Sequence, residues 1–198
     1  MNLREQADSN VVAIEQRVED LLGKLTLKEK VRLLSGKDSW HTATIERLGI
    51  PSLTMTDGPH GVRANQPDSG RIVSPATCFP TAISMTASWN PDLIEGVGAA
   101  LGEETRALGC EVLLGPCVNI VRVPLAGRNF ECSSEDPYLA GRIGVAYVKG
   151  VQSQKVAVSL KHYACNNQEA ERFRGNSVVD ERTLREIYLA QFETIVKE

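Results

Sequence analysis

Four short apolar segments, separated by helical patterns, constrain most strongly how this chain can fold. They span residues 50–56, 82–87, 111–115 and 156–160. Each is apolar along its length instead of alternating, which is typical of strands covered on both faces by helices or barrel packing. Strands that alternate with helices indicate βα units and a parallel sheet. We therefore predict an α/β fold.

Helix signals surround these four segments. A capping box beginning at Thr26 predicts a helix that Gly36 ends. Asn90 and Asp136 are each followed by proline, a pattern that predicts the start of a helix, and a last helix should begin near Asp180. The opening segment is also predicted to be helical, because its apolar residues recur at helical spacing: Ile14, Val18, Leu21, Leu22 and Leu25.

Size and composition fit one compact domain or a piece of a larger one. The chain has 198 residues, 42% of them hydrophobic, and a net charge of −3 with acids and bases mixed. No basic stripe or polybasic patch indicates nucleic-acid or membrane binding. Residues 1–20 are polar and resemble no targeting peptide, and the five cysteines show no C-x-x-C spacing. We expect reduced thiols, a cytoplasmic location and no cofactor.

Three of the predicted strands are followed by long predicted loops, residues 57–77, 115–136 and 161–179, and polar side chains lie where each strand ends. The segment AVSLKHYACN shows this most clearly, since an apolar run leads straight into a lysine and a histidine. In parallel α/β folds, ligands bind at the carboxyl ends of the strands. Any one such charge is more often a solvated loop residue, but their joint placement predicts one site. The polar residues at these strand ends are Asp57, Arg63, Arg128, Glu131, Lys161, His162, Gln168, Glu169 and Arg172.

This mixture of acidic, basic and imidazole groups suits a ligand dense with hydroxyls. Carboxylates accept hydrogen bonds from hydroxyls, while lysine and arginine donate to hydroxyl oxygens. Phosphate is the rival ligand, because it would explain the cations, although Asp57 would repel it. A metal site made of Asp57, His60 and His162 is a weaker alternative.

The sequence gives little evidence for nucleotide binding or for a serine nucleophile. The segment GVGAALG, residues 96–102, has the spacing G-x-G-x-x-x-G and falls inside a predicted helix, so we interpret it as a helix face made of small residues. Neither a P-loop nor a G-x-S-x-G nucleophile elbow occurs in the 198 residues.

Four long motifs stand in the order TDGPHGVR, GPCVNIVRVPLAGRNFECSSEDPYLAG, KHYACNNQEAER and DERTLREIYLAQFE. Together they closely resemble the N-terminal barrel domain of family 3 glycoside hydrolases, especially β-glucosidases, from about Val18 onward. The resemblance implies a (β/α) barrel and hydrolysis of terminal β-linked sugars with retention, through a carboxylate nucleophile and a carboxylic general acid/base. It also implies six candidate residues that bind the glycone, with Arg172 near the nucleophile: Asp57, Arg63, Arg128, Lys161, His162 and Arg172.

One departure from the family pattern limits this expectation. The family's nucleophile is an aspartate in an S-D-W-like motif on a later barrel strand, and its acid/base glutamate belongs to a following region. Neither motif occurs here, and the resemblance makes Glu131, Glu135 and Glu169 structural partners of arginine and backbone groups. No catalytic residue is therefore assigned to this chain.

The resemblance implies a partial TIM-like barrel of about four βα units. Residues 1–49 would be an N-terminal helical segment, and residues 50–198 the first half of a barrel. We expect the chain to supply the glycone-binding half of a β-glucosidase-type enzyme, to be inactive alone, and to need a C-terminal region or partner chain. Two alternatives stay open, a non-catalytic fragment or sugar-binding partner chain, and a phosphate-binding α/β protein.

Overall fold

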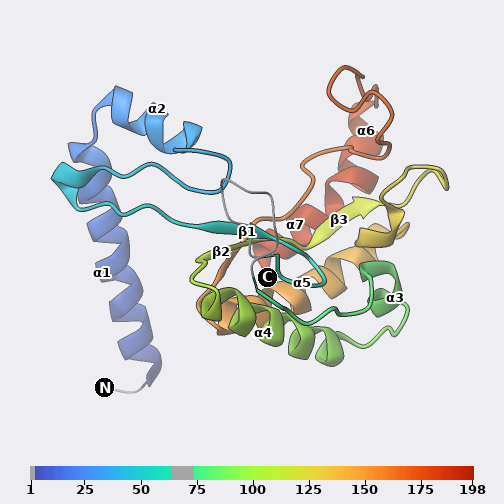
Figure 1. The fold of residues 1–198 in the computed structure, drawn as a ribbon, viewed down its shortest axis with the longest axis horizontal. Coiled ribbons are helices and arrows are strands. Elements are labelled where there is room, and N and C mark those ends of the chain that lie inside the picture. Colours follow the sequence, from blue (N-terminus) through green and yellow to red (C-terminus); the bar gives the residue numbers. More distant parts are fainter. Residues whose placement is uncertain (1–2, 64–73) are drawn as a thin grey trace. The chain divides into compact units, whose positions relative to one another are not determined.

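The computed structural model describes residues 3–63 and 74–198 (Figure 1). The chain forms two compact units, Met1–Leu53 and Thr54–Glu198. Each unit has its own hydrogen bonds and is described separately below.

The first unit contains two helices and a short 3-10 turn, α1 (Leu3–Lys24), α2 (Leu27–Ser35) and η1 (Glu46–Leu48). The predicted capping box is confirmed, because the Thr26 amide donates to Glu29 at 2.8 Å and the Glu29 amide donates to the Thr26 hydroxyl at 3.3 Å. The Arg47 guanidinium also binds Glu29, and with the bonds from Thr26 it lowers the pKa of Glu29 to about 2.

The second unit is built on a parallel three-stranded sheet. Its strands are β1 (Met55–Asp57), β2 (Val112–Leu114) and β5 (Ala157–Val158), in the spatial order β1-β2-β5. The register aligns Met55 with Val112. Three of the four predicted strands are therefore present. Each is shorter than the predicted segment and lies within it or at its edge, and the three strands are parallel as expected.

The second predicted strand is wrong. Residues 82–87 contain the helix α3 (Ala82–Thr86) instead. Ala82, Met85 and Thr86 are buried while Ile83 is exposed, which is the spacing of a helix face. A six-residue apolar run without clear alternation cannot be assigned to strand or helix from its periodicity alone.

Two further strands lie where the sequence predicts a long loop. β3 (Cys117–Ile120) and β4 (Cys132–Ser134) pair in parallel, with the 3-10 turn η2 (Asn129–Glu131) immediately before β4. The amide of Val118 donates to the carbonyl of Lys161 at 2.7 Å. β3 therefore runs beside the chain that leaves β5, and this places both segments near one edge of the sheet.

The long helices α4 (Pro91–Ala107) and α5 (Pro137–Ser153) pack against each other. Asn90 and Asp136 cap their first turns as predicted. The predicted helix face of small residues is confirmed, because a Cβ atom on Gly98 would lie 2.5 Å from a carbonyl oxygen of α5. The last predicted helix is divided into α6 (Glu181–Thr183), the π-helical turn η3 (Leu184–Tyr188) and α7 (Ala190–Lys197).

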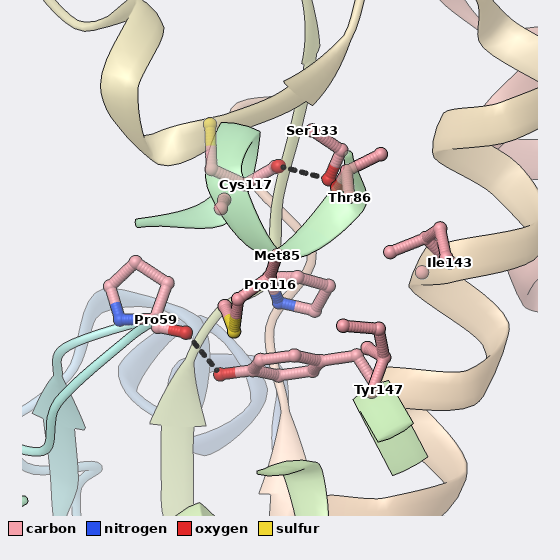
Figure 2. Close-up of a pocket in the computed structure, with 11 residues that line it drawn as sticks. Pro59, Met85, Thr86, Pro116, Cys117, Ser133, Ile143 and Tyr147 are labelled. Carbon is pink, nitrogen blue, oxygen red and sulfur yellow. Dashed lines mark hydrogen bonds between the residues drawn. The ribbon is translucent and has the colours of Figure 1, made fainter. Parts of the chain in front are cut away.

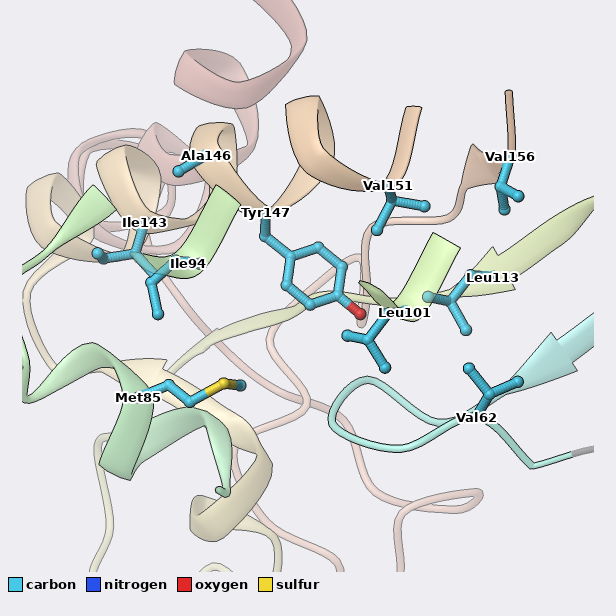
Figure 3. Packing of buried hydrophobic residues seen from close by; sticks show 10 residues of the cluster. All are labelled: Val62, Met85, Ile94, Leu101, Leu113, Ile143, Ala146, Tyr147, Val151 and Val156. Carbon is cyan, nitrogen blue, oxygen red and sulfur yellow. The ribbon is translucent and has the colours of Figure 1, made fainter. Parts of the chain in front are cut away.

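The main hydrophobic core of this unit lies between α4, α5 and the sheet (Figure 3). It includes Ile94, Leu101, Leu113, Tyr147 and Val151. Within the described residues, none of the helices is long and apolar enough to cross a membrane.

Candidate functional site

A tight turn places Asp57 beside Arg63 at the end of β1. The Arg63 amide donates to the Asp57 carbonyl at 2.9 Å, so the chain folds back on itself within six residues. Gly58 has a φ of 122°, and a Cβ atom there would lie 1.9 Å from the Gly61 carbonyl oxygen. Only glycine fits this position without rearrangement, which explains the Asp-Gly-Pro sequence after the strand.

The Asp57 carboxylate holds two cations. Its Oδ1 atom lies 2.6 Å from Nζ of Lys161, and its Oδ2 atom accepts from the Arg63 guanidinium. Burial raises the pKa of Asp57, but the hydrogen bond and charge of Lys161, followed by the Gly58 amide and the charge of Arg63, outweigh it and leave the pKa below its usual value. Asp57 is therefore an ionised, accepting group at neutral pH.

A second set of ion pairs is centred on Arg128. Its guanidinium binds Glu131, whose side chain is only 6% exposed, and lies 3.4 Å from Oε1 of Glu169. Glu169 also binds Arg172, with Nη1 of Arg172 2.9 Å from Oε2. Nζ of Lys161 lies 3.9 Å from Oε2 of Glu131, which links this set to Asp57.

His162 lies between this set and β3. Its Nε2 atom is 3.0 Å from Nη2 of Arg128, and its Nδ1 atom is 3.2 Å from Nδ2 of Asn119. The His162 amide donates to Oδ1 of Asn119 at 2.8 Å. Each ring nitrogen of His162 thus has a side-chain donor beside it.

The structure brings all six residues predicted for the site into this one network. Within it, four cations face three carboxylates, so most of the charge is balanced internally. Glu131 and Glu169 act here as ion-pair partners of arginine, and Glu135 is exposed. The metal alternative finds no support, because the described residues contain no group of three His, Cys, Asp or Glu side chains arranged to hold a metal ion.

Sequence analysis did not identify Asn119 as part of the site. This residue is 7% exposed and lies on β3, within a segment that was expected to be a loop. The signal that could have found it is an asparagine inside the apolar run CVNI, since a buried amide needs specific hydrogen-bond partners.

Two buried thiols lie under His162. The Sγ atoms of Cys117 and Cys132 are 3.2 Å apart, and Sγ of Cys117 is 3.8 Å from Nδ1 of His162. The neighbouring Cys132 thiol lowers the pKa of Cys117. All five cysteines are free thiols.

His60 lies beside the site without an ion-pair role. Its Nδ1 atom is buried and makes no hydrogen bond within the described parts of the chain, and its ring meets Phe130 edge to face at 5.9 Å. Burial, with a smaller effect of Lys161 and Arg63, lowers the pKa of His60.

A small pocket lies between α3, β3 and α5, and Cys117 is one of its lining residues (Figure 2). Pro59, Met85, Pro116, Ile143 and Tyr147 are among its lining residues, and Tyr147 donates to the Pro59 carbonyl at 3.0 Å. Its volume of about 10 Å³ holds at most one water molecule. This pocket is too small to hold a sugar.

The chain matches known proteins over almost its whole length. The model of the glycosyl hydrolase family 3 N-terminal domain matches residues 7–198. Thermostable β-glucosidase B of Acetivibrio thermocellus is 54% identical over 185 residues, which cover 91% of this chain and 24% of that protein. An exo-α-(1→6)-L-arabinopyranosidase of Bifidobacterium longum is 52% identical over 87% of this chain and 24% of its own length.

A solved structure gives the same result at the level of the fold. The β-glucosidase of Kluyveromyces marxianus in complex with glucose superposes with a TM-score of 0.84 at 46% identity, covering 91% of this chain and 21% of that one. The fold is accordingly a partial TIM-like (β/α) barrel with an N-terminal helical segment. The chain spans about a quarter of the length of the curated relatives that it matches.

Proposed function

Because the chain belongs to glycosyl hydrolase family 3 through its N-terminal domain, we propose that it supplies the glycone-binding part of an enzyme that hydrolyses terminal β-linked sugars. The observation that carries this proposal is the network joining Asp57, Lys161, Arg128 and His162 at one edge of the sheet. It combines one strong acceptor with several donors, as a polyhydroxylated ligand requires.

Each side chain has a distinct part in this proposal. The ionised Asp57 accepts hydrogen bonds from sugar hydroxyls, since a carboxylate with two cation partners still has free lone pairs. Lys161 and Arg128 donate to hydroxyl oxygens, and these charge-assisted bonds are stronger than neutral ones. Such contacts select for hydroxyls, because a ligand lacking one would leave a buried group unpaired.

The bond-cleaving carboxylates are proposed to come from outside these 198 residues. Glu131 and Glu169, the other two carboxylates of the network, are held in ion pairs with arginine, and these ion pairs support the proposal. A retaining mechanism needs a free nucleophile and a general acid/base on opposite sides of the glycosidic bond. Arg172, which is bound to Glu169, would lie near that nucleophile and help to keep it ionised.

We further propose that the barrel begun by Thr54–Glu198 is completed by a C-terminal region or partner chain. Large apolar side chains beyond Lys161 support this, because Phe173 and Val178 are each 89% exposed. The free cysteines support a cytoplasmic location for the enzyme.

A neutral sugar is favoured over phosphate as the ligand. Four cations of the network face three carboxylates, so little uncompensated positive charge remains for a doubly charged anion. Glucose is the first sugar to test and L-arabinopyranose the second, because the relatives include β-glucosidases and an arabinopyranosidase.

Two measurements test this function. Calorimetric titration of the chain with glucose, L-arabinose and ATP should give heat for a sugar, and heat for ATP alone would contradict the proposal. The chain alone should not hydrolyse an aryl β-glucoside. A chimera in which residues 7–198 replace the matching segment of the Acetivibrio enzyme should hydrolyse it. A folded but inactive chimera that binds no sugar would overturn the assignment.

A further inference from the structure

Hydrogen-bond donors face both ring nitrogens of His162. Nδ2 of Asn119 lies 3.2 Å from Nδ1, and Nη2 of Arg128 lies 3.0 Å from Nε2. Amide and guanidinium nitrogens only donate, whereas a neutral imidazole accepts at one ring nitrogen and donates from the other. One of the two contacts therefore brings two donors together.

The orientation of the Asn119 amide is fixed by two backbone groups, an N–H that can only donate and a carbonyl that can only accept. Its Oδ1 atom receives the His162 amide N–H at 2.8 Å, and its Nδ2 atom donates to the Asn166 carbonyl at 2.7 Å. Rotating the amide by 180° would break both bonds. Nδ2 must therefore face Nδ1 of His162, and its second hydrogen is available to that nitrogen.

Arg128 is the less constrained of the two donors. Its side chain is 27% exposed and has Glu131 and Glu169 as partners, whereas Asn119 is 7% exposed on a strand. The Asn119 amide, whose direction is fixed, is accordingly assigned the hydrogen bond to His162, although the Arg128 contact is the shorter one.

We infer that Asn119 is a positioning residue that holds His162 as the neutral tautomer with its proton on Nε2. His162 then donates from Nε2, and Arg128 donates beside it. Within residues 3–63 and 74–198 no acceptor joins these two donors, and a ligand oxygen that accepts from both would complete the arrangement. Naming this oxygen as a sugar hydroxyl rests on the proposed function, whereas the tautomer does not.

The competing arrangement is an ion pair between a Cys117 thiolate and a His162 imidazolium. It would require a proton on Nδ1, which would then face both the Asn119 amide group and the sulfur. An imidazolium would also turn an N–H group toward a donor at each ring nitrogen, Asn119 at Nδ1 and Arg128 at Nε2, and this disfavours the ion pair.

Nuclear magnetic resonance of the chain labelled with ¹⁵N at histidine tests the inference. The chain has three histidines, and His41→Gln and His60→Gln variants assign the remaining signals to His162. At pH 8, above the usual imidazole titration range, we expect a protonated Nε2 and an unprotonated Nδ1. A proton on Nδ1 alone, or on both nitrogens, would overturn the inference.

Two asparagine variants add a matched comparison. In Asn119→Asp, a carboxylate oxygen replaces the donor, so the proton should move from Nε2 to Nδ1. Asn129→Asp, at a half-buried asparagine whose side chain donates to the Val123 and Pro124 carbonyls, should leave the tautomer unchanged. Equal spectra of wild type and Asn119→Asp would contradict the role of Asn119. If Asn119→Asp fails to fold, the wild-type spectrum alone decides.

Glucose then separates the tautomer from the proposed function. A shift of the His162 Nε2 signal on adding glucose supports both. An Nε2–H tautomer whose signal does not respond to glucose supports the inference and counts against the proposed function.

Discussion

Nζ of Lys161 lies 2.6 Å from Oδ1 of Asp57, although 104 positions separate the two residues in the chain. The pairing follows from the sheet, in which β1 and β5 both pair in parallel with β2, so that their carboxyl ends reach the same edge. Both side chains are mostly shielded from water, with exposed fractions of 14% and 21%. The site is therefore organised around this ion pair.

Replacing Asp57 with asparagine should destabilise the chain at pH 7 by about 2 kcal/mol, because it leaves a shielded lysine with only a distant carboxylate. The folded-state pKa of Asp57 is lowered, so the ion pair contributes its stability above the unfolded value near 3.8. This contribution is lost as the pH falls through the lower folded value. The difference in unfolding free energy between the variant and the wild type should thus become smaller in acid.

Urea denaturation at pH 7 and pH 3 measures this difference. Asp20→Asn, at an exposed aspartate of α1, is the matched control and should have little effect at either pH. If Asp57→Asn lowers the free energy of unfolding by the same amount at pH 7 and pH 3, the ion-pair account is contradicted.

Gly58→Ala should disrupt the turn that brings Arg63 to Asp57. The backbone conformation and the 1.9 Å approach to the Gly61 carbonyl together should cost about 2 kcal/mol or more, lowering the melting temperature by roughly 6 °C. Gly96→Ala on α4 has open space for its methyl group and should be neutral or slightly stabilising. Equal melting temperatures for the two variants would show that the turn is not strained by a side chain.

Glu169→Gln should make the site more attractive to anions. Arg128 and Arg172 would both lose a charged partner, and inorganic phosphate should bind roughly fivefold more tightly, about 1 kcal/mol. Glu171→Gln is the control, since that side chain is 71% exposed. Calorimetry with phosphate gives both affinities, and unchanged phosphate binding in Glu169→Gln would argue against charge balance as the basis of selectivity.

The sequence predicted the parallel sheet and the members of the site for the same reason. Apolar runs identify buried strands, and polar residues directly after them must lie at the strand ends, so Asp57 and Lys161 could be placed on one edge. The capping residues Thr26, Asn90 and Asp136 were equally predictable, because capping depends on local sequence.

The parts of the fold and of the site that were not predicted depend on tertiary contacts, which no local sequence pattern encodes. Residues 82–87 are helical because of the spacing of their buried side chains, and β3 and β4 are too short and polar to be recognised without their partners. The position of Asn119 against His162 results from that missed strand. Which carboxylate neutralises which arginine likewise follows from tertiary packing alone.

The most direct test of the glycone-binding account is the kcat/KM of the chimeric enzyme on an aryl β-glucoside after Lys161→Met, compared with Lys155→Met at an exposed lysine beyond the end of α5. Hydroxyl contacts at the reacting sugar strengthen in the transition state. Loss of the Lys161 contact should therefore lower kcat/KM about 100-fold, close to 3 kcal/mol, while Lys155→Met leaves it unchanged. Equal kcat/KM values for the two variants would contradict the account.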